Sequence, residues 1–419
     1  MHPSAVEVME GAWRCPGMRD LLPEEMERFR WVENIFRDVC LAWGYQEVRT
    51  PTVEHLFLFT AAGTLSPQLL GRVYSFLDWD GWSGERVVLR PDNTIPTARL
   101  YVENFPEGSL AKLFYVQSVF RFGEGDREEW QCGVEILGDT QPLGDLEVIL
   151  LGREILTRLG VEGKVYLAHS GLIRAVLGRT GLAPVEQMRL YDSLLEGQGD
   201  GLAQLAKLLP QLGPSVASLL QEEGEGAAFV RNLRSVLAPT LPEVEAPLRE
   251  LEALATTLEY IGMIPLVKGI MARNFEYYTG PMVEFWAEGG LVGAGGRYDS
   301  LVQLLCGRQV PACGFAFYLG RLLSLARPPT YAHGQPLMVE ALEKSPEVMA
   351  KVFTVAQRLR ERGIPVRVAL GSGDLLGQGS RLQVRREELV LFPPGGVVGE
   401  RLGSVEDVID RLGQGGAPG

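Results

Sequence analysis

A carboxylate and a hydroxyl lie two residues apart in the segment 88–94, at the end of an apolar strand. Asp92 and Thr94 supply these groups directly after Val88-Leu89-Arg90-Pro91. A free amino acid carries an ammonium, which needs oxygen acceptors, and a carboxylate, which needs a cation or N–H donors. The segment supplies acceptors, so we expect it to form part of a site that binds an amino acid.

Later segments supply the other kinds of side chain that such a site needs. They carry guanidinium, amide, carboxylate and phenol groups, and one of them reads Gly-Gly-Arg-Tyr-Asp. These segments are 119–122, 129–135, 273–280 and 295–299. No single segment identifies the site, but their order and spacing are informative as a set.

The set resembles the catalytic core of histidyl-tRNA synthetase, a class II aminoacyl-tRNA synthetase. It is more similar to a relative without synthetase activity, the regulatory subunit of the short-form ATP phosphoribosyltransferase of histidine biosynthesis. The resemblance runs from about Gly17 to Arg321. It implies an α+β fold, with a class II synthetase-like antiparallel sheet flanked by helices, a helical insertion and a small α/β C-terminal domain.

The resemblance also implies a histidine-binding site. In the synthetases the ammonium is held by residues that match Asp92, Thr94, Gln131 and Glu135. The match of Arg121 faces the carboxylate, and that of Arg273 helps to activate it. The pair Tyr277-Tyr278 matches the segment that receives the imidazole, although two strand tyrosines with one ring in the core would look the same. Asp92 stands where synthetases carry Glu, which favours the regulatory subunits.

Residues 122–130 argue against adenylation of the amino acid. This loop is shorter than in the synthetases and carries four acids against Arg127, where the ligands would be polyanions. Glu129 falls where the adenine-stacking aromatic belongs, and Trp130 could replace that aromatic only if the register slipped by one residue. Arg273 and Arg321, which match synthetase arginines, are the features that favour aminoacylation, although Gly320 replaces the usual Glu.

We therefore interpret the chain as a regulatory subunit with no catalytic residues, cofactor or tRNA partner. The resemblance implies the short-form catalytic subunit as partner, histidine as effector, and a homodimer core within a hetero-octamer. Two alternatives stay open from the residues alone. One is a divergent histidyl-tRNA synthetase, and the other is an amino-acid-binding relative with a different client enzyme.

Composition excludes several other classes of protein. Five scattered cysteines form no CxxC pair, and four separated histidines indicate no metal site. We find no run of about 18 apolar residues for a membrane span and no secretion signal, so a cytoplasmic protein is expected. The formal charge of −13 argues mildly against a large polyanionic partner.

Patterning along the chain predicts the elements that must position the site. We expect a helix over 21–44 that begins near Pro23, a strand over 45–52, an antiparallel sheet over 73–137 and a helix over 146–159. The glycine-rich run 293–296 suggests a turn or bulge close to a ligand. The expected domains are 1–330, with the helical insertion at about 167–258, and 331–419, which opens with a β-α-β pattern and resembles a degenerate anticodon-binding domain.

Overall fold

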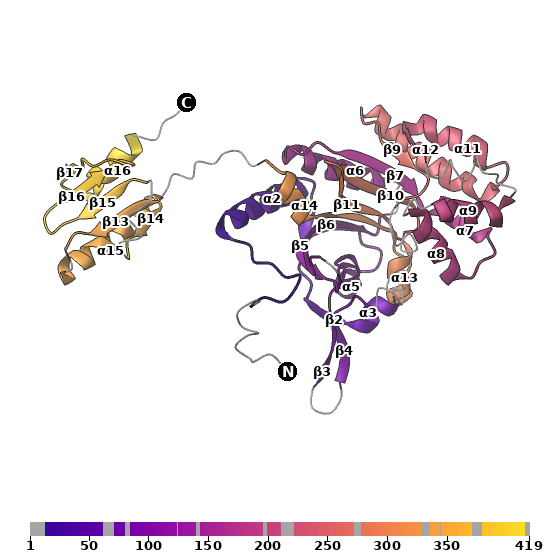
Figure 1. The fold of residues 1–419 in the computed structure, drawn as a ribbon, viewed down its shortest axis with the longest axis horizontal. Helices are drawn as coiled ribbons and strands as arrows, with labels where there is room; N and C mark the ends of the chain where they lie inside the picture. The colour runs from indigo at the N-terminus through magenta and orange to yellow at the C-terminus, as the bar shows by residue number, and fades with distance from the viewer. Residues whose placement is uncertain are drawn as a thin grey trace, which may run out of the picture. The chain divides into compact units, whose positions relative to one another are not determined.

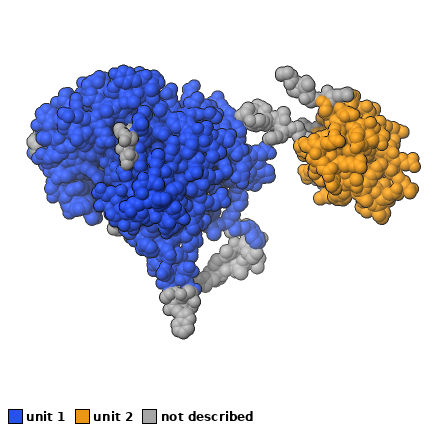
Figure 2. Space-filling view, turned by 180° about the vertical axis from the view of Figure 1, so that it is seen from behind, with its two compact units in different colours: residues 1–328 blue, residues 329–419 orange. Residues whose placement is uncertain are grey.

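The computed structural model describes most of the 419 residues. The described ranges are 13–61, 71–79, 84–123, 125–139, 143–195, 199–210, 222–271, 278–327, 336–343, 345–370 and 379–414. The chain divides into two compact units, Met1–Pro328 and Pro329–Gly419 (Figure 2). The candidate site lies in the first unit. No helix among the described residues has the length and apolar character needed to cross a membrane.

A nine-stranded mixed sheet forms the centre of the first unit (Figure 1). Its strand order is β1-β5-β6-β12-β11-β10-β7-β9-β8, and only the pairs β1/β5 and β7/β9 are parallel among these described strands. The strands, in the same order, are Gln46–Glu47, Ala111–Phe120, Glu128–Leu137, Ala312–Tyr318, Gly290–Arg297, Pro281–Ala287, Lys164–His169, Leu266–Lys268 and Glu223–Glu225. The antiparallel sheet predicted over 73–137 is confirmed only for β5 and β6, because the strands before them, β3 (Ser75–Trp79) and β4 (Gly84–Leu89), belong to a separate small sheet.

Helices α2 (Pro23–Ala42), α6 (Leu143–Arg158) and α14 (Leu319–Leu325) cover one face of this sheet (Figure 1). The predicted start of α2 at Pro23 is confirmed, with Glu24 and Glu25 in its first turn, where they complement the helix dipole. Its buried face carries Phe29, which packs on Trp130 of β6, and Phe36, which packs on Phe114 of β5, within the largest apolar core. Because helices cover this face of the central sheet, a ligand site would have to lie on the other face of the sheet.

The strand predicted over 45–52 is shorter than expected. Only Gln46–Glu47 pairs with β5. The carbonyls of Thr50 and Pro51 instead accept from Nη1 of the buried Arg90, at 2.8 and 3.0 Å. The Arg90 side chain, and not a neighbouring strand, is therefore the hydrogen-bond partner of this backbone.

Helices α3 (Leu56–Ala61), α5 (Thr94–Asn104) and α13 (Ser300–Cys306) pack at one end of the second face. A three-stranded sheet in the order β2-β4-β3 lies beside them (Figure 1). Its strands are Val53–His55, Gly84–Leu89 and Ser75–Trp79. Because β4 leads directly into α5, the segment that carries Asp92 and Thr94 lies where the small sheet meets the large one.

Most of the region 167–258 is helical, but its borders differ from the prediction. Residues 167–169 belong to strand β7 of the central sheet, and β8 and β9 add two further strands to it. The helices are α7 (Ser170–Gly178), α8 (Pro184–Leu195), α9 (Gly199–Leu208), α11 (Gly226–Leu237), the 3-10 turn η2 (Pro242–Val244) and α12 (Glu245–Tyr260). The helical segment is thus tied to the sheet by strands that Leu- and Ala-rich composition did not reveal.

The second unit contains the β-α-β pattern that the sequence predicts. Strands β13 (Leu337–Ala341) and β14 (Val366–Val368) are parallel and are joined by α15 (Pro346–Glu361). Ser345 caps α15, because its side chain accepts from the backbone N–H of Val348. The remaining elements are β15 (Arg381–Val384), β16 (Leu389–Phe392), β17 (Glu400–Leu402) and α16 (Val405–Gln414), and the sheet order is β14-β13-β15-β16-β17.

Candidate functional site

Small residues occupy the middle of the second face of the central sheet. Strand pairing aligns Gly133 of β6 with Ala316 of β12 and Ala294 of β11. In the next row Glu135 faces Gly314, which in turn faces Gly296. These five Gly and Ala residues, here called the small-residue floor, leave room above the sheet. The run 293–296 is therefore part of strand β11, and the prediction of a turn there is wrong. The pairing of β10 with β11 does shift in register at the start of the run, where Phe285 faces Gly293 and Trp286 faces Leu291, as in a bulge.

Glu135 is the most buried carboxylate at the edge of this floor, with 1% of its surface exposed. The Tyr115 hydroxyl donates to its Oε1 at 3.1 Å, and the Tyr298 hydroxyl donates to its Oε2. The Thr94 side chain hydrogen-bonds to Glu135 as well. The structure thus brings together Glu135 and Thr94, two of the residues predicted for the site.

Two glycines make space for this cluster. A Cβ at position 133 would lie 2.3 Å from the phenol of Tyr115, and a Cβ at position 314 would lie 2.0 Å from Oε2 of Glu135. Both distances are far below van der Waals contact, so any larger residue would displace the phenol or the carboxylate. The Tyr115 and Glu135 side chains can lie across neighbouring strands because those strands carry no side chain at these positions.

Burial raises the pKa of Glu135 to about 8. Hydrogen bonds from Tyr298, Thr94 and Tyr115 oppose this rise, and the nearby charge of Asp92 adds to it. None of the groups that act on Glu135 in the described structure is a cation. A buried carboxylate with hydrogen-bond donors but no counterion is suited to a ligand that brings its own positive charge.

Asp92 is a second acid at this site. It lies just before α5, and its Oδ1 accepts from the backbone N–H of Ile95 at 2.9 Å. Burial raises the pKa of Asp92, while the Ile95 hydrogen bond and the charge of Arg121 lower it. The charge of Asp92 raises the pKa of Glu135, so a cationic ligand shared by the two acids would stabilise their ionised forms.

Gln131 lies beyond Glu135 on the same side of β6 and is 4% exposed. Its Oε1 accepts from Nδ2 of the buried Asn93 at 3.2 Å, and Asn93 also reaches the carbonyl of Gln117. An amide oxygen has two lone pairs, so Oε1 can still accept from an ammonium. Asn93 therefore fixes Gln131 near the two acids.

Arg121 lies at the more open end of the site, with 44% of its side chain exposed. Its Nε donates to the carbonyl of Pro91 at 2.9 Å, and its Nη1 lies 3.7 Å from Oε2 of Glu129. Burial raises the pKa of Glu129, and the charges of Arg121 and Arg321 lower it. An acid thus stands between the two arginines that could contact an anionic ligand.

Trp130 does not take the place of an adenine-stacking aromatic. Side chains alternate between the faces of a strand, and Trp130 points to the face opposite Gln131. There its ring packs edge-on against Phe29 of α2, with centroids 5.2 Å apart. The one-residue shift in register that would have placed Trp130 in the adenine-stacking position is therefore absent.

Tyr278 is placed beside the acids of the site. Burial raises its pKa, and the nearby groups Tyr318, Asp92, Glu135 and Glu284 raise it further. Its carbonyl accepts from Nη2 of Arg174 at 2.6 Å. Arg273 and Tyr277, the other two predicted site residues, lie outside the described residues.

Several residues of the site were not predicted. Tyr298 occurs in the Gly-Gly-Arg-Tyr-Asp segment, but the pattern of that segment did not assign Tyr298 to the site. Period-two alternation from Arg121 back to Tyr115 would have pointed to Tyr115. Glu284 of β10 gave no signal, although it is 6% exposed and lies opposite Ala294 at the far side of the small-residue floor. The Trp286 indole N–H donates to it at 2.8 Å. Asn93 and Tyr318 are the other two residues of the site that were not predicted.

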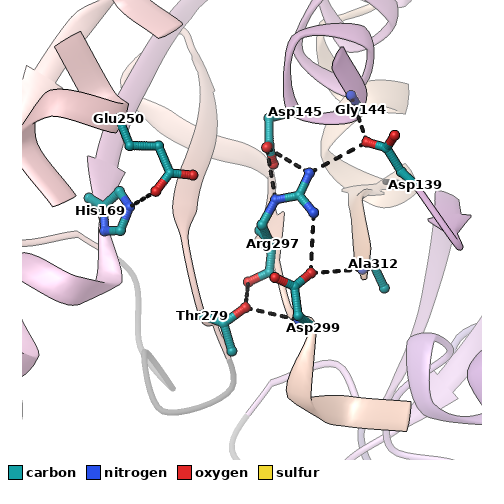
Figure 3. Close-up of polar contacts among 9 residues, drawn as sticks. All are labelled: Asp139, Gly144, Asp145, His169, Glu250, Thr279, Arg297, Asp299 and Ala312. Carbon is teal, nitrogen blue, oxygen red and sulfur yellow. Dashed lines mark hydrogen bonds and ion pairs between the residues drawn. The ribbon is translucent and has the colours of Figure 1, made fainter. Parts of the chain in front are cut away.

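Arg297 forms an ion pair with Asp299, with Nη1 3.2 Å from Oδ1 (Figure 3). Arg297 has a closer partner in Asp145, whose Oδ2 lies 2.7 Å from its Nη2, and Asp139 lies at 3.6 Å. Asp299 also accepts from the backbone N–H of Ala312. The network joins α6 to strands β11 and β12, so it fixes the backbone on either side of Tyr298.

Nearby, the buried His169 bridges β7 and α12 (Figure 3). Its Nδ1 accepts from the backbone N–H of Gly171, and its Nε2 lies 3.0 Å from Oε2 of Glu250. This arrangement uses both ring nitrogens inside the protein and lowers the pKa of Glu250. No group of three or more His, Cys, Asp or Glu residues in the described ranges could hold a metal ion.

The site and its sheet match a known family. The family model described as histidyl-tRNA synthetase matches residues 17–322, which is most of the chain. A relative from Dehalococcoides mccartyi, an ATP phosphoribosyltransferase regulatory subunit, is 42% identical over 90% of this chain and 92% of its own length. This chain belongs to the histidyl-tRNA synthetase family.

Within the family, the chain is less similar to a curated ligase. A histidine–tRNA ligase from Methanosarcina acetivorans is 31% identical over 93% of this chain and 91% of the relative. A solved Bacillus halodurans structure, described as an ATP phosphoribosyltransferase regulatory subunit/histidyl-tRNA synthetase, has a TM-score of 0.73 and 25% identity, and covers 89% of this chain and 97% of its own. The predicted class II synthetase-like fold is confirmed.

Proposed function

We propose that this chain is the regulatory subunit of a short-form ATP phosphoribosyltransferase and binds histidine at the site around Glu135. The chain carries out no catalytic step of its own. The similarity to the Dehalococcoides regulatory subunits supports the role, since it covers nearly the whole length of both chains. We take histidine, the end product of the pathway, as the effector through which the chain regulates the enzyme.

The proximity of Asp92 to Glu135 is the observation that supports the proposal most directly. Two carboxylates that are costly to ionise lie beside hydroxyl and amide groups, and Arg121 lies at the other end. An α-amino acid matches this arrangement, because its ammonium reaches the acids and its carboxylate faces the guanidinium. Tyr278 lies close enough to contribute to the ring end of the ligand.

The acidic side of the site favours sensing over adenylation. Glu129 lies beside Arg121 and interacts with Arg321, so the groups that would meet ATP phosphates are partly neutralised. Trp130 is turned into the core against Phe29. A nucleotide would find repulsion from Glu129 and no aromatic surface at Trp130.

Regulation requires histidine to bind one arrangement of the complex more tightly than another. We propose that the chain forms a homodimer core that assembles with the catalytic subunit into a hetero-octamer in the cytoplasm, without binding tRNA. Histidine then stabilises the less active arrangement. Its effect on activity is limited by the difference between its two affinities.

A thermal-shift titration with histidine, run beside histidine-dependent ATP–pyrophosphate exchange, tests the proposal. We expect the melting temperature to rise with histidine and no exchange to occur. Glu135→Ala should fold but lose the histidine-induced rise. Exchange by the purified chain would contradict the proposal and favour a histidine–tRNA ligase, and a Glu135→Ala variant that binds histidine normally would contradict the assigned site.

A further inference from the structure

We propose that Glu129 competes with the ligand for Arg121. The Glu129 carboxylate occupies the guanidinium in the empty protein, and the carboxylate of the amino acid has to displace it. The inference rests on the proposed histidine site and concerns how tightly that site binds. Glu129 lowers the affinity for histidine, and it thereby raises the histidine concentration at which the site fills.

Glu129 and Arg121 lie side by side at the open end of the site. The backbone N–H of Arg121 donates to the carbonyl of Arg127 at 2.9 Å, which holds the end of β5 beside the start of β6. Side chains alternate between the faces of a strand, so Glu129 lies on the same face of β6 as Gln131. Oε2 of Glu129 lies 3.7 Å from Nη1 of Arg121. An acid of the protein is therefore paired with the cation proposed to face the ligand carboxylate.

A ligand can open this pair at small cost. The separation of 3.7 Å is longer than a hydrogen bond, and 36% of the Glu129 side chain and 44% of the Arg121 side chain are exposed to solvent. The guanidinium is also held independently of Glu129, because its Nε donates to the carbonyl of Pro91 at 2.9 Å. A ligand carboxylate can therefore replace Glu129 while Arg121 stays in place.

The displaced acid keeps a cation nearby. Burial raises the pKa of Glu129, the charge of Arg121 lowers it, Asp126 raises it and Arg321 lowers it. Arg321 belongs to α14, whereas Arg121 follows β5. When a ligand takes Arg121, the charge of Arg321 still stabilises the Glu129 carboxylate. Displacement thus does not leave a partly buried acid without a counterion.

Simple repulsion between Glu129 and the ligand carboxylate would also weaken binding. The two effects differ in their dependence on Arg121. Competition requires the guanidinium, because without it Glu129 occupies nothing that the ligand needs. Repulsion acts whether or not the guanidinium is present. Substitution of the two residues, separately and together, therefore distinguishes the two effects.

The experiment is a histidine titration of the full chain, its Glu129→Gln and Arg121→Ala variants, and the double variant. Calorimetry measures the tighter affinities, and thermal shift up to high histidine concentration measures those of the variants without Arg121. Glutamine keeps the shape of the side chain and removes its charge. We expect Glu129→Gln to bind histidine about three- to tenfold more tightly than the parent. In the Arg121→Ala background the same change should alter the affinity by less than about twofold.

The matched control is Glu128→Gln. Glu128 precedes Glu129 and lies on the opposite face of β6, so its substitution changes the net charge equally without affecting Arg121. This variant should bind histidine as the parent does. A gain of affinity like that of Glu129→Gln would reveal an effect of net charge and contradict the inference.

The remaining outcomes separate this inference from the proposed function. A gain in affinity cannot result from misfolding, so the expected result is specific. If the parent binds histidine and Glu129→Gln binds it equally or more weakly, the competition is wrong and the histidine site stands. An equal gain with and without Arg121 would show repulsion alone, and the inference is again wrong. If neither the parent nor Glu129→Gln binds histidine, the proposed function and this inference fail together.

Discussion

Trp130 and Phe29 pack edge to face, with ring centroids 5.2 Å apart and ring planes at 88°. This contact lies between strand β6 and helix α2, on the face of the central sheet opposite Gln131 and Glu135. Two consecutive residues of β6 therefore have different roles, because Trp130 belongs to the core and Gln131 belongs to the site. The contact also removes the candidate that could have restored an adenine surface.

Replacement of Trp130 should therefore affect stability and not ligand binding. We expect Trp130→Ala to lower the free energy of unfolding by about 2 kcal/mol, because it removes a partly buried ring and its aromatic contact. Histidine affinity should be unchanged at temperatures where the variant is folded. The matched control is Trp79→Ala, whose ring is 67% exposed. A loss of histidine affinity in Trp130→Ala with normal stability would contradict this placement.

The pKa of Glu135 predicts how stability depends on pH. In the empty protein this pKa rises from 4.5 to about 8, so the folded state binds more protons than the unfolded state between these values. The free energy of unfolding should then fall as pH increases from about 4.5 to 8. Glu135→Gln removes this titration, so the variant should gain stability relative to the parent over the same window.

Urea unfolding of the parent and Glu135→Gln at pH 5, 6.5 and 8, without histidine, measures this difference. Equal pH dependence of the two proteins would show that Glu135 does not carry the raised pKa. Histidine should then be added at pH 8 to both proteins. It should stabilise the parent and have little effect on Glu135→Gln, which lacks the charge that attracts an ammonium.

Arg121 should report the carboxylate end of the ligand. We expect Arg121→Ala to weaken histidine binding about tenfold or more, through loss of a charge-assisted hydrogen bond. Histamine has the ammonium and imidazole but no carboxylate, so its affinity should be nearly the same for the parent and the variant. A parallel loss of both affinities in calorimetric titration would mean that Arg121 supports the site in some other way.

Arg297 should contribute strongly to stability, because three aspartates surround it. Loss of its charge in Arg297→Met would leave the mostly buried Asp145 without its nearest cation. We expect a cost of about 3–5 kcal/mol in the free energy of unfolding. Arg231→Met is the control, because Arg231 is 54% exposed and pairs with Glu252 at 3.5 Å, and its cost should stay below about 1 kcal/mol. Similar losses in the two variants would argue against a structural role for the Arg297 network.

The sequence predicted the elements whose signals are local. Pro23 and the acids after it located the start of α2, and apolar spacing located the helix now seen as α6. The meeting of Asp92, Thr94 and Glu135 was predicted from resemblance, because these residues lie in recognisable segments. Their contact in the structure depends on β6 lying beside β5 and α5, which no local pattern encodes.

The missed features depend on strand register. Tyr298 reaches Glu135 across 163 residues of sequence, and the contact forms because β11 and β6 are both neighbours of β12. The run 293–296 suggested a turn because glycine favours turns, whereas here glycine lets neighbouring strands and side chains come close. A Cβ at Gly295 would lie 2.1 Å from the carbonyl oxygen of Gly314. The face of the sheet on which Trp130 lies could have been predicted from its alternation with Gln131, if residues 128–137 had been assigned to one strand.

Reconstitution of ATP phosphoribosyltransferase activity tests the central claim most directly. The cognate short-form catalytic subunit would be assayed alone, with this chain, and with this chain during a histidine titration. We predict that the chain raises the activity, that histidine lowers it again, and that the complex with Glu135→Ala stays active but insensitive to histidine. A catalytic subunit whose activity is the same with and without this chain would contradict the account.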